Sequence, residues 1–180
     1  MRIISGQARG RKLTTLPGDN TRPTLDRTRE ALFNILQTRV FDAQVLDLFA
    51  GSGALALEAL SRGAEYAVLC DRSPEACRVI EQNIDAVRVR DQALLLRCEA
   101  SSAVRQLNGR KFDVIFLDPP YRKGLIDEAL IGIMENDLLA QDGLITAETA
   151  LDEGFNVPDG LKIADVRKYG KSRLHFIERV

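Results

Sequence analysis

The chain has 180 residues, of which 45% are hydrophobic and 28% are charged, with a formal net charge of −1. These values are typical of one globular domain with its own core, and they exclude a fibrous or wholly disordered chain. No apolar run reaches the length of about 20 residues that a membrane-spanning helix needs, and the N-terminus lacks the pattern of a signal peptide. We therefore expect a cytoplasmic monomer without a membrane partner. The three cysteines form no tight cluster, which predicts reduced thiols and no metal site.

The charge is distributed unevenly along the chain. Residues 1–40 contain eight basic and three acidic side chains, a net charge of +5, which leaves −6 for the remainder. A basic segment on an acidic body is typical of a surface that binds phosphate, although a solvated charged face has the same composition. The segment starts with two predicted short strands, residues 2–5 and 11–15, around the small loop Gly6–Gly10. A loop of this size can follow an RNA backbone closely.

A cluster of turn-forming residues at positions 17–20 separates this predicted hairpin from the rest of the chain. We expect residues 1–20 to form a basic hairpin extension and residues 21–180 to form the main domain. The main domain begins with a helix predicted from about Leu25 to Thr38, because apolar side chains recur along one face of it.

The next stretch predicts a buried strand, a tight turn and a helix. Residues 45–49 are mostly apolar, as a parallel strand covered on both faces requires. Gly51 and Gly53 have no Cβ, so that a ligand can lie against the backbone, and the helical pattern starts at Ala54. The pattern Gly51-x-Gly53-x-x-Ala56 is a nucleotide-binding fingerprint in the expected context. It leaves open NAD, FAD, S-adenosylmethionine, or merely close packing of helix on strand.

Asp47 favours S-adenosylmethionine among these ligands. A carboxylate inside a buried strand is costly unless it holds something. Dinucleotide enzymes rarely place an acid there, whereas S-adenosylmethionine carries a cationic ammonium and a cationic sulfonium. The alternative is an aspartate that only accepts hydrogen bonds from the amides of the turn.

The remaining elements alternate between strand and helix. Strands are predicted over residues 66–70, 93–98, 112–117 and 144–148, helices over 74–88 and 127–139, and a closing hairpin over 162–169 and 173–179. This alternation predicts a parallel, doubly wound sheet, which binds ligands at the carboxyl ends of its strands. Four acids stand at or near such ends: Asp47, Asp71, Glu99 and Asp118.

Four acids around one crevice would repel pyrophosphate, but they suit a cationic nucleoside that has no phosphate. Asp71, eighteen positions beyond Gly53, is placed to accept hydrogen bonds from both hydroxyls of a ribose. No Lys-Ser or Lys-Thr pair follows the glycines, which excludes a P-loop. The residues therefore predict S-adenosylmethionine, with S-adenosylhomocysteine as the product.

The sequence Asp118-Pro119-Pro120-Tyr121 closes the fourth predicted strand. Prolines have no amide hydrogen, so the site offers acceptors only, beside the flat ring of Tyr121. Such a site fits a planar exocyclic amine of a nucleobase, since acceptors on both N–H bonds free its lone pair for a methyl group. The base must leave its stack to reach it. The alternative is a Pro-Pro turn that only ends a strand.

These motifs resemble known enzymes. Asp-Pro-Pro-Tyr is similar to the signature of methyltransferases that act on amino groups of nucleic acids. More narrowly, Arg22-Pro23-Thr24-x-Asp26-Arg27-x-Arg29-Glu30, the stretch Asp47–Leu55 and the stretch Leu57–Ala64 resemble the RsmD family of bacterial 16S ribosomal RNA guanine-N2 methyltransferases. The resemblance implies a class I methyltransferase fold with a seven-stranded, Rossmann-like sheet. It also implies an N-terminal hairpin that helps to hold RNA, naked or within the small ribosomal subunit or its assembly intermediate.

Carried over by position, the resemblance and the residues together give three sets of candidates. The cofactor-binding set is Thr24, Asp47, Phe49, Gly51, Ser52, Gly53, Asp71, Arg72, Glu99 and Ala100. The catalytic set is Asp118, Pro119, Pro120 and Tyr121. The RNA-binding set is Arg2, Arg9, Arg11, Lys12 and Arg22. Glu99 stands where the family usually has a shorter Asp or Asn against the adenine, which leaves that contact open.

Three other functions remain as alternatives. A DNA adenine-N6 methyltransferase shares the Asp-Pro-Pro-Tyr motif, but 180 residues leave little room for a target-recognition domain. A pyridine-nucleotide oxidoreductase would need a substrate-binding domain and a proton donor. A catalytically silent RNA-binding module would not need an intact motif at residues 118–121.

Overall fold

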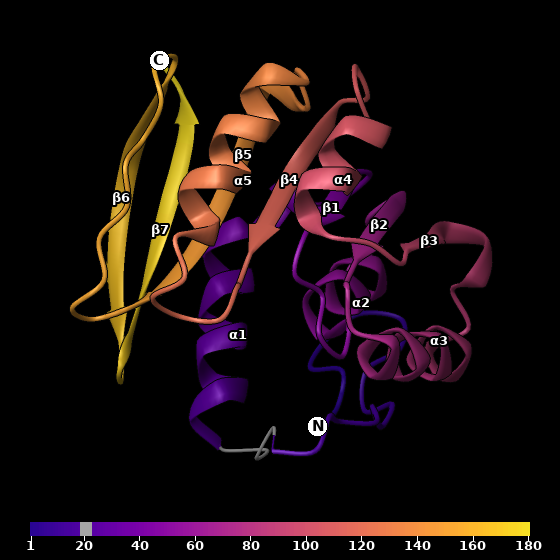
Figure 1. Cartoon of the computed structure of the whole chain (residues 1–180). Coiled ribbons are helices and arrows are strands. Elements are labelled where there is room, and N and C mark those ends of the chain that lie inside the picture. Colours follow the sequence, from indigo (N-terminus) through magenta and orange to yellow (C-terminus); the bar gives the residue numbers. More distant parts are fainter. Residues whose placement is uncertain (19–22) are drawn as a thin grey trace.

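The computed structural model describes residues 1–18 and 23–180, with the side chains of residues 1–18 and 25–180. One seven-stranded sheet lies between two layers of helices (Figure 1). The strands are β1 (Gln44–Asp47), β2 (Tyr66–Cys70), β3 (Ala93–Leu96), β4 (Phe112–Leu117), β5 (Leu139–Ala150), β6 (Leu161–Tyr169) and β7 (Ser172–Arg179). The helices are α1 (Pro23–Leu36), α2 (Ala54–Ser61), α3 (Pro74–Val87), α4 (Ala100–Gln106) and α5 (Leu125–Glu135), with short 3₁₀ turns η1 (Gln37–Val40) and η2 (Arg90–Gln92).

The strand order is β3-β2-β1-β4-β5-β7-β6. The five strands from β3 to β5 are parallel, and β7 joins antiparallel to both β5 and β6. The chain therefore winds outward from β1 in both directions, and β1 and β4 meet at the point where the order reverses. In open α/β sheets this switch point is where ligands bind.

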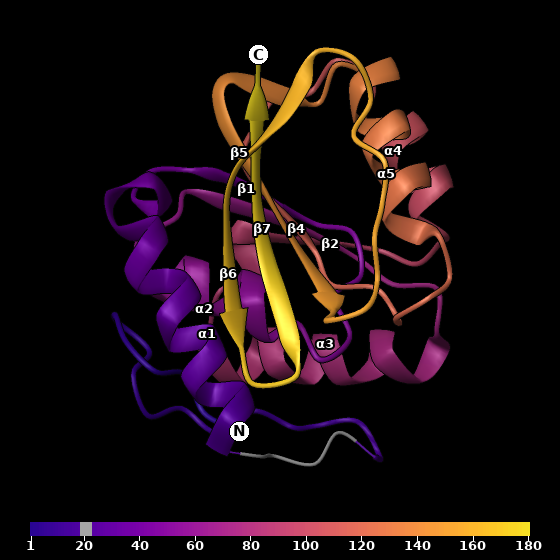
Figure 2. The same cartoon turned by 90° about the vertical axis from the view of Figure 1, so that its left-hand side faces the viewer.

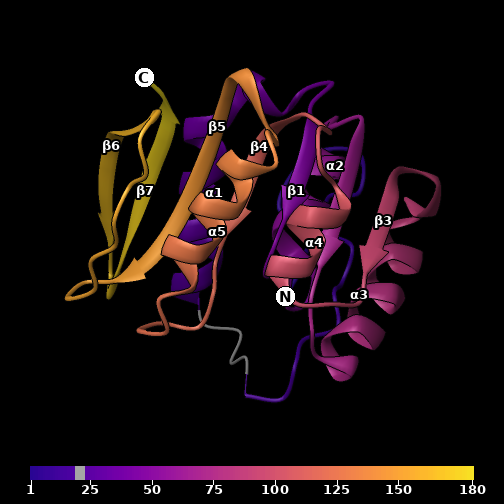
Figure 3. The ribbon, with the colours of Figure 1, turned by 45° about the horizontal axis from the view of Figure 1, so that its top comes forward.

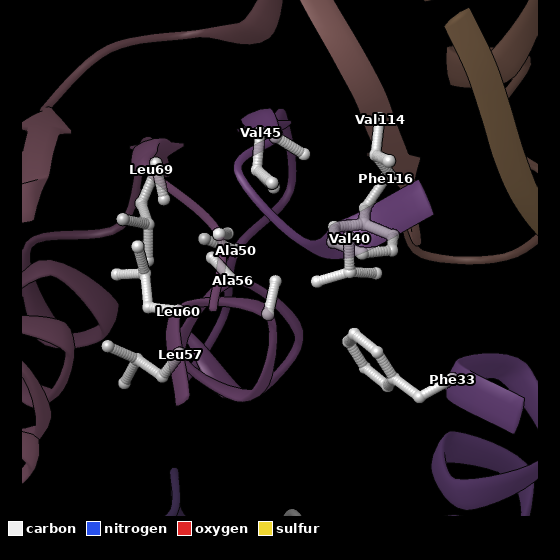
Figure 4. Close-up of a cluster of buried hydrophobic side chains, with 14 of the residues drawn as sticks. Phe33, Val40, Val45, Ala50, Ala56, Leu57, Leu60, Leu69, Val114 and Phe116 are labelled. Atoms are coloured by element: carbon white, nitrogen blue, oxygen red, sulfur yellow. The ribbon is translucent and has the colours of Figure 1, made fainter. Parts of the chain in front are cut away.

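Each face of the sheet is covered by its own set of helices. Helices α1, α2 and α3 pack on one face, where Phe33 of α1 meets Phe116 of β4 with ring centroids 5.9 Å apart (Figure 4). Helices α4 and α5 cover the other face (Figure 3). The central strands are buried on both faces, which explains why their sequences are continuous apolar runs.

The N-terminal segment, residues 1–18, packs on α2 and α3. Two of its apolar side chains, Ile3 and Leu13, lie in the same core as the helices. The Glu58 carboxylate of α2, which is fully buried, accepts hydrogen bonds from the amides of Ile4 and Ser5 at 2.8 and 2.9 Å. The division of the chain at residue 20 remains a prediction.

The expected N-terminal hairpin has the right connection but no strands. Arg2 and Lys12 form a single antiparallel bridge, and the residues between them form turns. Three backbone hydrogen bonds of 2.9 Å still join the two segments: the amides of Ile3, Gly10 and Leu13 donate to the carbonyls of Arg11, Ile3 and Met1. The amides of Ser5 and Ala8 donate instead to Glu58 and Ser61 of α2, so docking on α2 limits the pairing to the base of the hairpin.

Several elements differ from the sequence-based expectation. Helix α5 ends at Glu135 rather than at residue 139, where β5 begins, and β1 ends at Asp47 rather than at residue 49. Helix α4 is absent from that expectation, because its seven residues have only two buried apolar side chains. It packs closely on α5, where a Cβ on Gly132 would lie 2.8 Å from Val104 Cγ2. Strand β5 begins at Leu139 instead of residue 144. The residues expected to form a turn at Asp142-Gly143 lie within the strand, where its register with β4 shifts. Strand β3 ends at Leu96 rather than at Cys98.

Candidate active site

A cavity of about 610 Å³ opens at the carboxyl ends of the parallel strands. The loops after β1, β2, β3 and β4 line it, together with residues of α1, β5 and β7. All four acids expected at strand ends line this cavity: Asp47, Asp71, Glu99 and Asp118. The volume is that of a pocket for a small molecule.

The glycine loop turns sharply between β1 and α2. Gly51 and Gly53 have φ angles of +57° and +81°, which side chains rarely adopt. Phe49, Gly51 and Ser52 line the cavity, as expected for cofactor-binding residues. Gly53 does not line it. A Cβ on Gly53 would lie 3.1 Å from Leu69 of β2, so this glycine allows the helix to approach the sheet.

Asp47 is 1% exposed at the end of β1. Burial raises the pKa of its carboxyl to about 7; the nearby Asp71 adds to this rise, and backbone hydrogen bonds from Phe49 and Ala56 oppose it. The bond from the Phe49 amide is long, at 3.4 Å. Because these bonds do not offset burial, the carboxylate carries an electrostatic cost that a cationic ligand would relieve.

Asp71 is held rigidly at the end of β2. One carboxylate oxygen accepts the amide of Gly51 at 2.9 Å, and the other accepts the amide of Ser73 at 2.9 Å. This links the ends of β1 and β2. Since a carboxylate offers about four acceptor positions, two remain for the hydroxyls of a ribose.

Two more expected cofactor residues, Arg72 and Glu99, form an exposed ion pair of 3.3 Å at the edge of the cavity. Ala100, the next residue, also lines the cavity at the start of α4. Glu99 is therefore engaged by Arg72, and its contact with an adenine stays a prediction. Thr24 and Arg22 were also expected to bind cofactor and RNA, but the Thr24 side chain and Arg22 lie outside the described residues.

The expected catalytic residues follow β4 directly and share the cavity with the glycine loop. Asp118 is exposed, Pro119 is buried, and Tyr121 is 40% exposed. The Tyr121 hydroxyl donates to Glu148 of β5 at 2.9 Å, which fixes the ring at the mouth of the cavity. Burial raises the pKa of the Tyr121 hydroxyl. The nearby carboxylates of Glu148 and Asp118 raise it further, and a hydrogen bond with Ser172 lowers it.

The four expected RNA-binding side chains within residues 1–18 are exposed, and two of them have structural partners. Arg2 donates to the carbonyl of Gly10 at 2.8 Å, and Arg11 donates to the carbonyl of Ala86 at 3.2 Å. Arg9 and Lys12 are exposed, and within residues 1–18 and 25–180 neither side chain forms an ion pair. Their contact with RNA stays a prediction.

Sequence reasoning missed two residues that organise the site. Glu148 lies near the end of β5, as the other acids lie near the ends of their strands. Its position in the sequence does not show that it holds the Tyr121 hydroxyl. Asn83 of α3 is fully buried and bridges the N-terminal segment to the glycine loop. Its amide nitrogen donates to Thr14 O at 2.9 Å and Ser52 O at 2.8 Å, and its oxygen accepts the Thr14 amide at 2.7 Å. Nothing in the local sequence marks these long-range contacts.

The residues present fit S-adenosylmethionine. The cavity combines an undercompensated buried carboxylate at Asp47 for a cationic group with free acceptor positions on Asp71 for a ribose. A dinucleotide would bring a pyrophosphate to a cavity whose described lining includes seven acids and two arginines, which is electrostatically unfavourable.

Known proteins are similar over nearly the whole chain. The family described as "Conserved hypothetical protein 95" matches residues 1–178. "Ribosomal RNA small subunit methyltransferase D" of Escherichia coli K12 is 41% identical over 155 residues, which are 86% of this chain and 77% of that protein. The same-named protein of Haemophilus influenzae is 36% identical over 161 residues, 88% of this chain and 83% of that one.

The solved structure described as "Putative methyltransferase yhhF from Escherichia coli" has a TM-score of 0.88 and 37% identity, and covers 99% of this chain and 97% of its own. The family match and the identities over most of the chain settle the relationship. They confirm the predicted fold and cofactor: the chain belongs to the RsmD family of S-adenosylmethionine-dependent methyltransferases with the class I fold.

Proposed function

We propose that this protein methylates the exocyclic N2 amine of a guanine in 16S ribosomal RNA. The observation that carries the proposal is the position of Asp118–Tyr121 in the same cavity as the glycine loop and Asp71. A group that accepts hydrogen bonds from an amine therefore lies next to the residues suited to the methyl donor. The names of the relatives from E. coli and H. influenzae support ribosomal RNA of the small subunit as the substrate.

When bound, the cofactor supplies a methyl group on a positively charged sulfur. Asp118 and the carbonyl oxygens beside it accept the two N–H bonds of the amine. Pro119 and Pro120 add no competing donor, because neither has an amide hydrogen. The acceptors localise the nitrogen lone pair, which is otherwise delocalised into the purine ring, and they hold it in line for transfer.

Tyr121 provides the surface on which the extruded base stacks. Its hydroxyl is held by Glu148, so the ring is oriented before the base arrives. Stacking contributes about 1–3 kcal/mol per base, which offsets much of the cost of taking a base out of its stack. Guanine rather than adenine is the target in this proposal, in keeping with the family.

Mass spectrometry of ribosomal RNA nucleosides tests this proposal. RNA from cells that lack the protein is treated with the purified protein and a labelled methyl donor, as naked 16S RNA, as small subunits and as assembly intermediates. We expect label in N2-methylguanosine, at one position. Label in N6-methyladenosine, or no label in any of the three substrates, would contradict the proposal.

A further inference from the structure

The tip of the β6–β7 hairpin, residues 168–173, lies beside residues 118–121, the proposed acceptor site, since Ser172 of the tip forms a hydrogen bond with Tyr121. Ser172 pairs with Ala150 at the end of β5, two residues beyond Glu148, which holds Tyr121. Leu174, the second residue after Ser172, lines the cavity. The tip and the N-terminal segment occupy the same edge of the molecule (Figures 1 and 2), and Figure 1 shows α1 between them.

The tip carries three exposed cations: Lys168, Lys171 and Arg173. Among the residues that the structure describes, none of the three forms an ion pair. The other cations of this hairpin do: Lys162 pairs with Glu178 at 3.4 Å, Arg167 with Asp165 at 2.7 Å, and Arg179 with Asp137 at 3.1 Å. Within the described part of the chain, the unpaired positive charge of this hairpin is therefore confined to its end at the acceptor site.

Two of these cations oppose each other directly. Lys168 on β6 and Arg173 on β7 are register partners, so their side chains project from neighbouring positions of one sheet face. Like charges directly opposite on neighbouring strands destabilise the pair. This arrangement does not stabilise the fold, whereas an anion between the two side chains would relieve their repulsion.

We propose that this tip binds the phosphate backbone of the RNA beside the extruded base. The proposal rests on the proposed function, because the RNA that places a guanine beside Tyr121 must run past the rim of the cavity. The N-terminal segment then contacts the RNA on one side of α1 and the hairpin tip contacts it on the other. Contacts with phosphate do not depend on the nucleotide sequence of the RNA. The tip therefore contributes to the affinity for RNA and does not determine which guanine is methylated.

Salt-dependent titration of naked 16S RNA tests the tip. The variant Lys168→Gln/Lys171→Gln/Arg173→Gln is compared with a control, Arg90→Gln/Lys111→Gln/Lys162→Gln, which removes the same charge from cations that are paired with Asp85, Asp137 and Glu178. We expect the tip variant to bind at least about tenfold more weakly and its log–log salt slope to shrink by about 2, since each phosphate contributes roughly 0.7. The control should bind like the wild type.

The affinity for S-adenosylmethionine should be unchanged in both variants, which shows that the site is intact. Lys168→Gln alone should leave the thermal midpoint unchanged or raise it, because it removes the like-charge opposition. Equal weakening by the tip and control variants, wild-type binding by the tip variant, or a lower midpoint for Lys168→Gln would overturn the proposal. Nucleoside analysis of the wild type stays a separate readout: absence of N2-methylguanosine refutes the proposed function even when the tip binds RNA.

Discussion

The two sides of the cavity are built differently. On the cofactor side, Asp47 is 1% exposed and Asp71 is fixed by two backbone amides. On the acceptor side, Asp118 is exposed and Tyr121 is 40% exposed, with its hydroxyl held by Glu148. One side is closed and electrostatically costly, and the other is open.

This difference reflects the ligand that each side receives. The cofactor side takes a small cation, so a buried carboxylate that destabilises the empty protein becomes favourable when the ligand is bound. In the proposed function the acceptor side takes one base of a macromolecule, which carries its own stacking partners and phosphates, so its residues must remain accessible. Substitutions on each side should separate the two roles, from the largest expected effect to the smallest.

Asp118→Ala should lower the rate of methyl transfer by at least about 10²–10³-fold, the effect of removing one preorganised electrostatic partner in an active site. The affinity for S-adenosylmethionine should remain nearly that of the wild type, because Asp118 acts on the base. Single-turnover assays and calorimetric titration measure the two quantities. Equal losses of transfer rate and of cofactor affinity would mean that Asp118 also binds the cofactor, so that the two sides do not have separate roles.

Gly6→Ala should destabilise the fold by about 3 kcal/mol, since its Cβ would lie 1.8 Å from the Ser61 carbonyl oxygen and displace amides that donate to Glu58. Gly10→Ala is the matched control: its φ of +82° is nearly that of Gly6 at +85°, but no atom lies within 4 Å of the added Cβ. It should cost only about 1 kcal/mol of backbone strain. Denaturant unfolding measures both variants, and equal losses would contradict the docking of residues 1–18 on α2.

Asp47 should make cofactor binding depend on pH. With a pKa of about 7 in the empty site, its carboxyl is mostly protonated at pH 6 and ionised at pH 8. A cation binds the ionised form, so the affinity for S-adenosylmethionine should rise about tenfold between these pH values. Asp47→Asn should bind more weakly and lose the pH dependence; a pH-dependent variant would show that another group titrates.

The same residue predicts a change in stability of the empty protein. Because burial raises the pKa of Asp47 above its value in the unfolded chain, stability is lost as pH rises from about 4 through about 7. Asp47→Asn should therefore raise the thermal midpoint at pH 8 and change it little at pH 4. A lower midpoint at pH 8 would contradict an electrostatic cost at this position.

The smallest effect is expected for Tyr121→Phe, which keeps the ring and loses only the bond to Glu148. A partly exposed hydrogen bond is worth about 1 kcal/mol, so kcat/KM for RNA should fall by less than about tenfold. Tyr121→Ala also removes the stacking surface and should cost roughly 1–3 kcal/mol more. If the two variants behave alike, the ring does not stack on the base.

Periodicity and strand ends are enough to predict much of this molecule. The buried strands, the glycine turn and the meeting of four acids at one edge arise from local patterns, because a parallel sheet places the ends of its strands together. Asn83, Glu148 and the docking of Ile4 and Ser5 on Glu58 depend on contacts between residues far apart in sequence. Helix α4 is not predicted, for a local reason: its short, polar sequence has almost no hydrophobic periodicity.

A crystal structure of the protein with S-adenosylmethionine would test the shared cavity most directly. We expect the ribose hydroxyls on Asp71, a cationic group near Asp47, and the methyl group directed toward the space between Asp118 and Tyr121. A cofactor bound outside this cavity, or bound with its methyl group facing away from Asp118–Tyr121, would contradict the arrangement from which the proposed function is drawn.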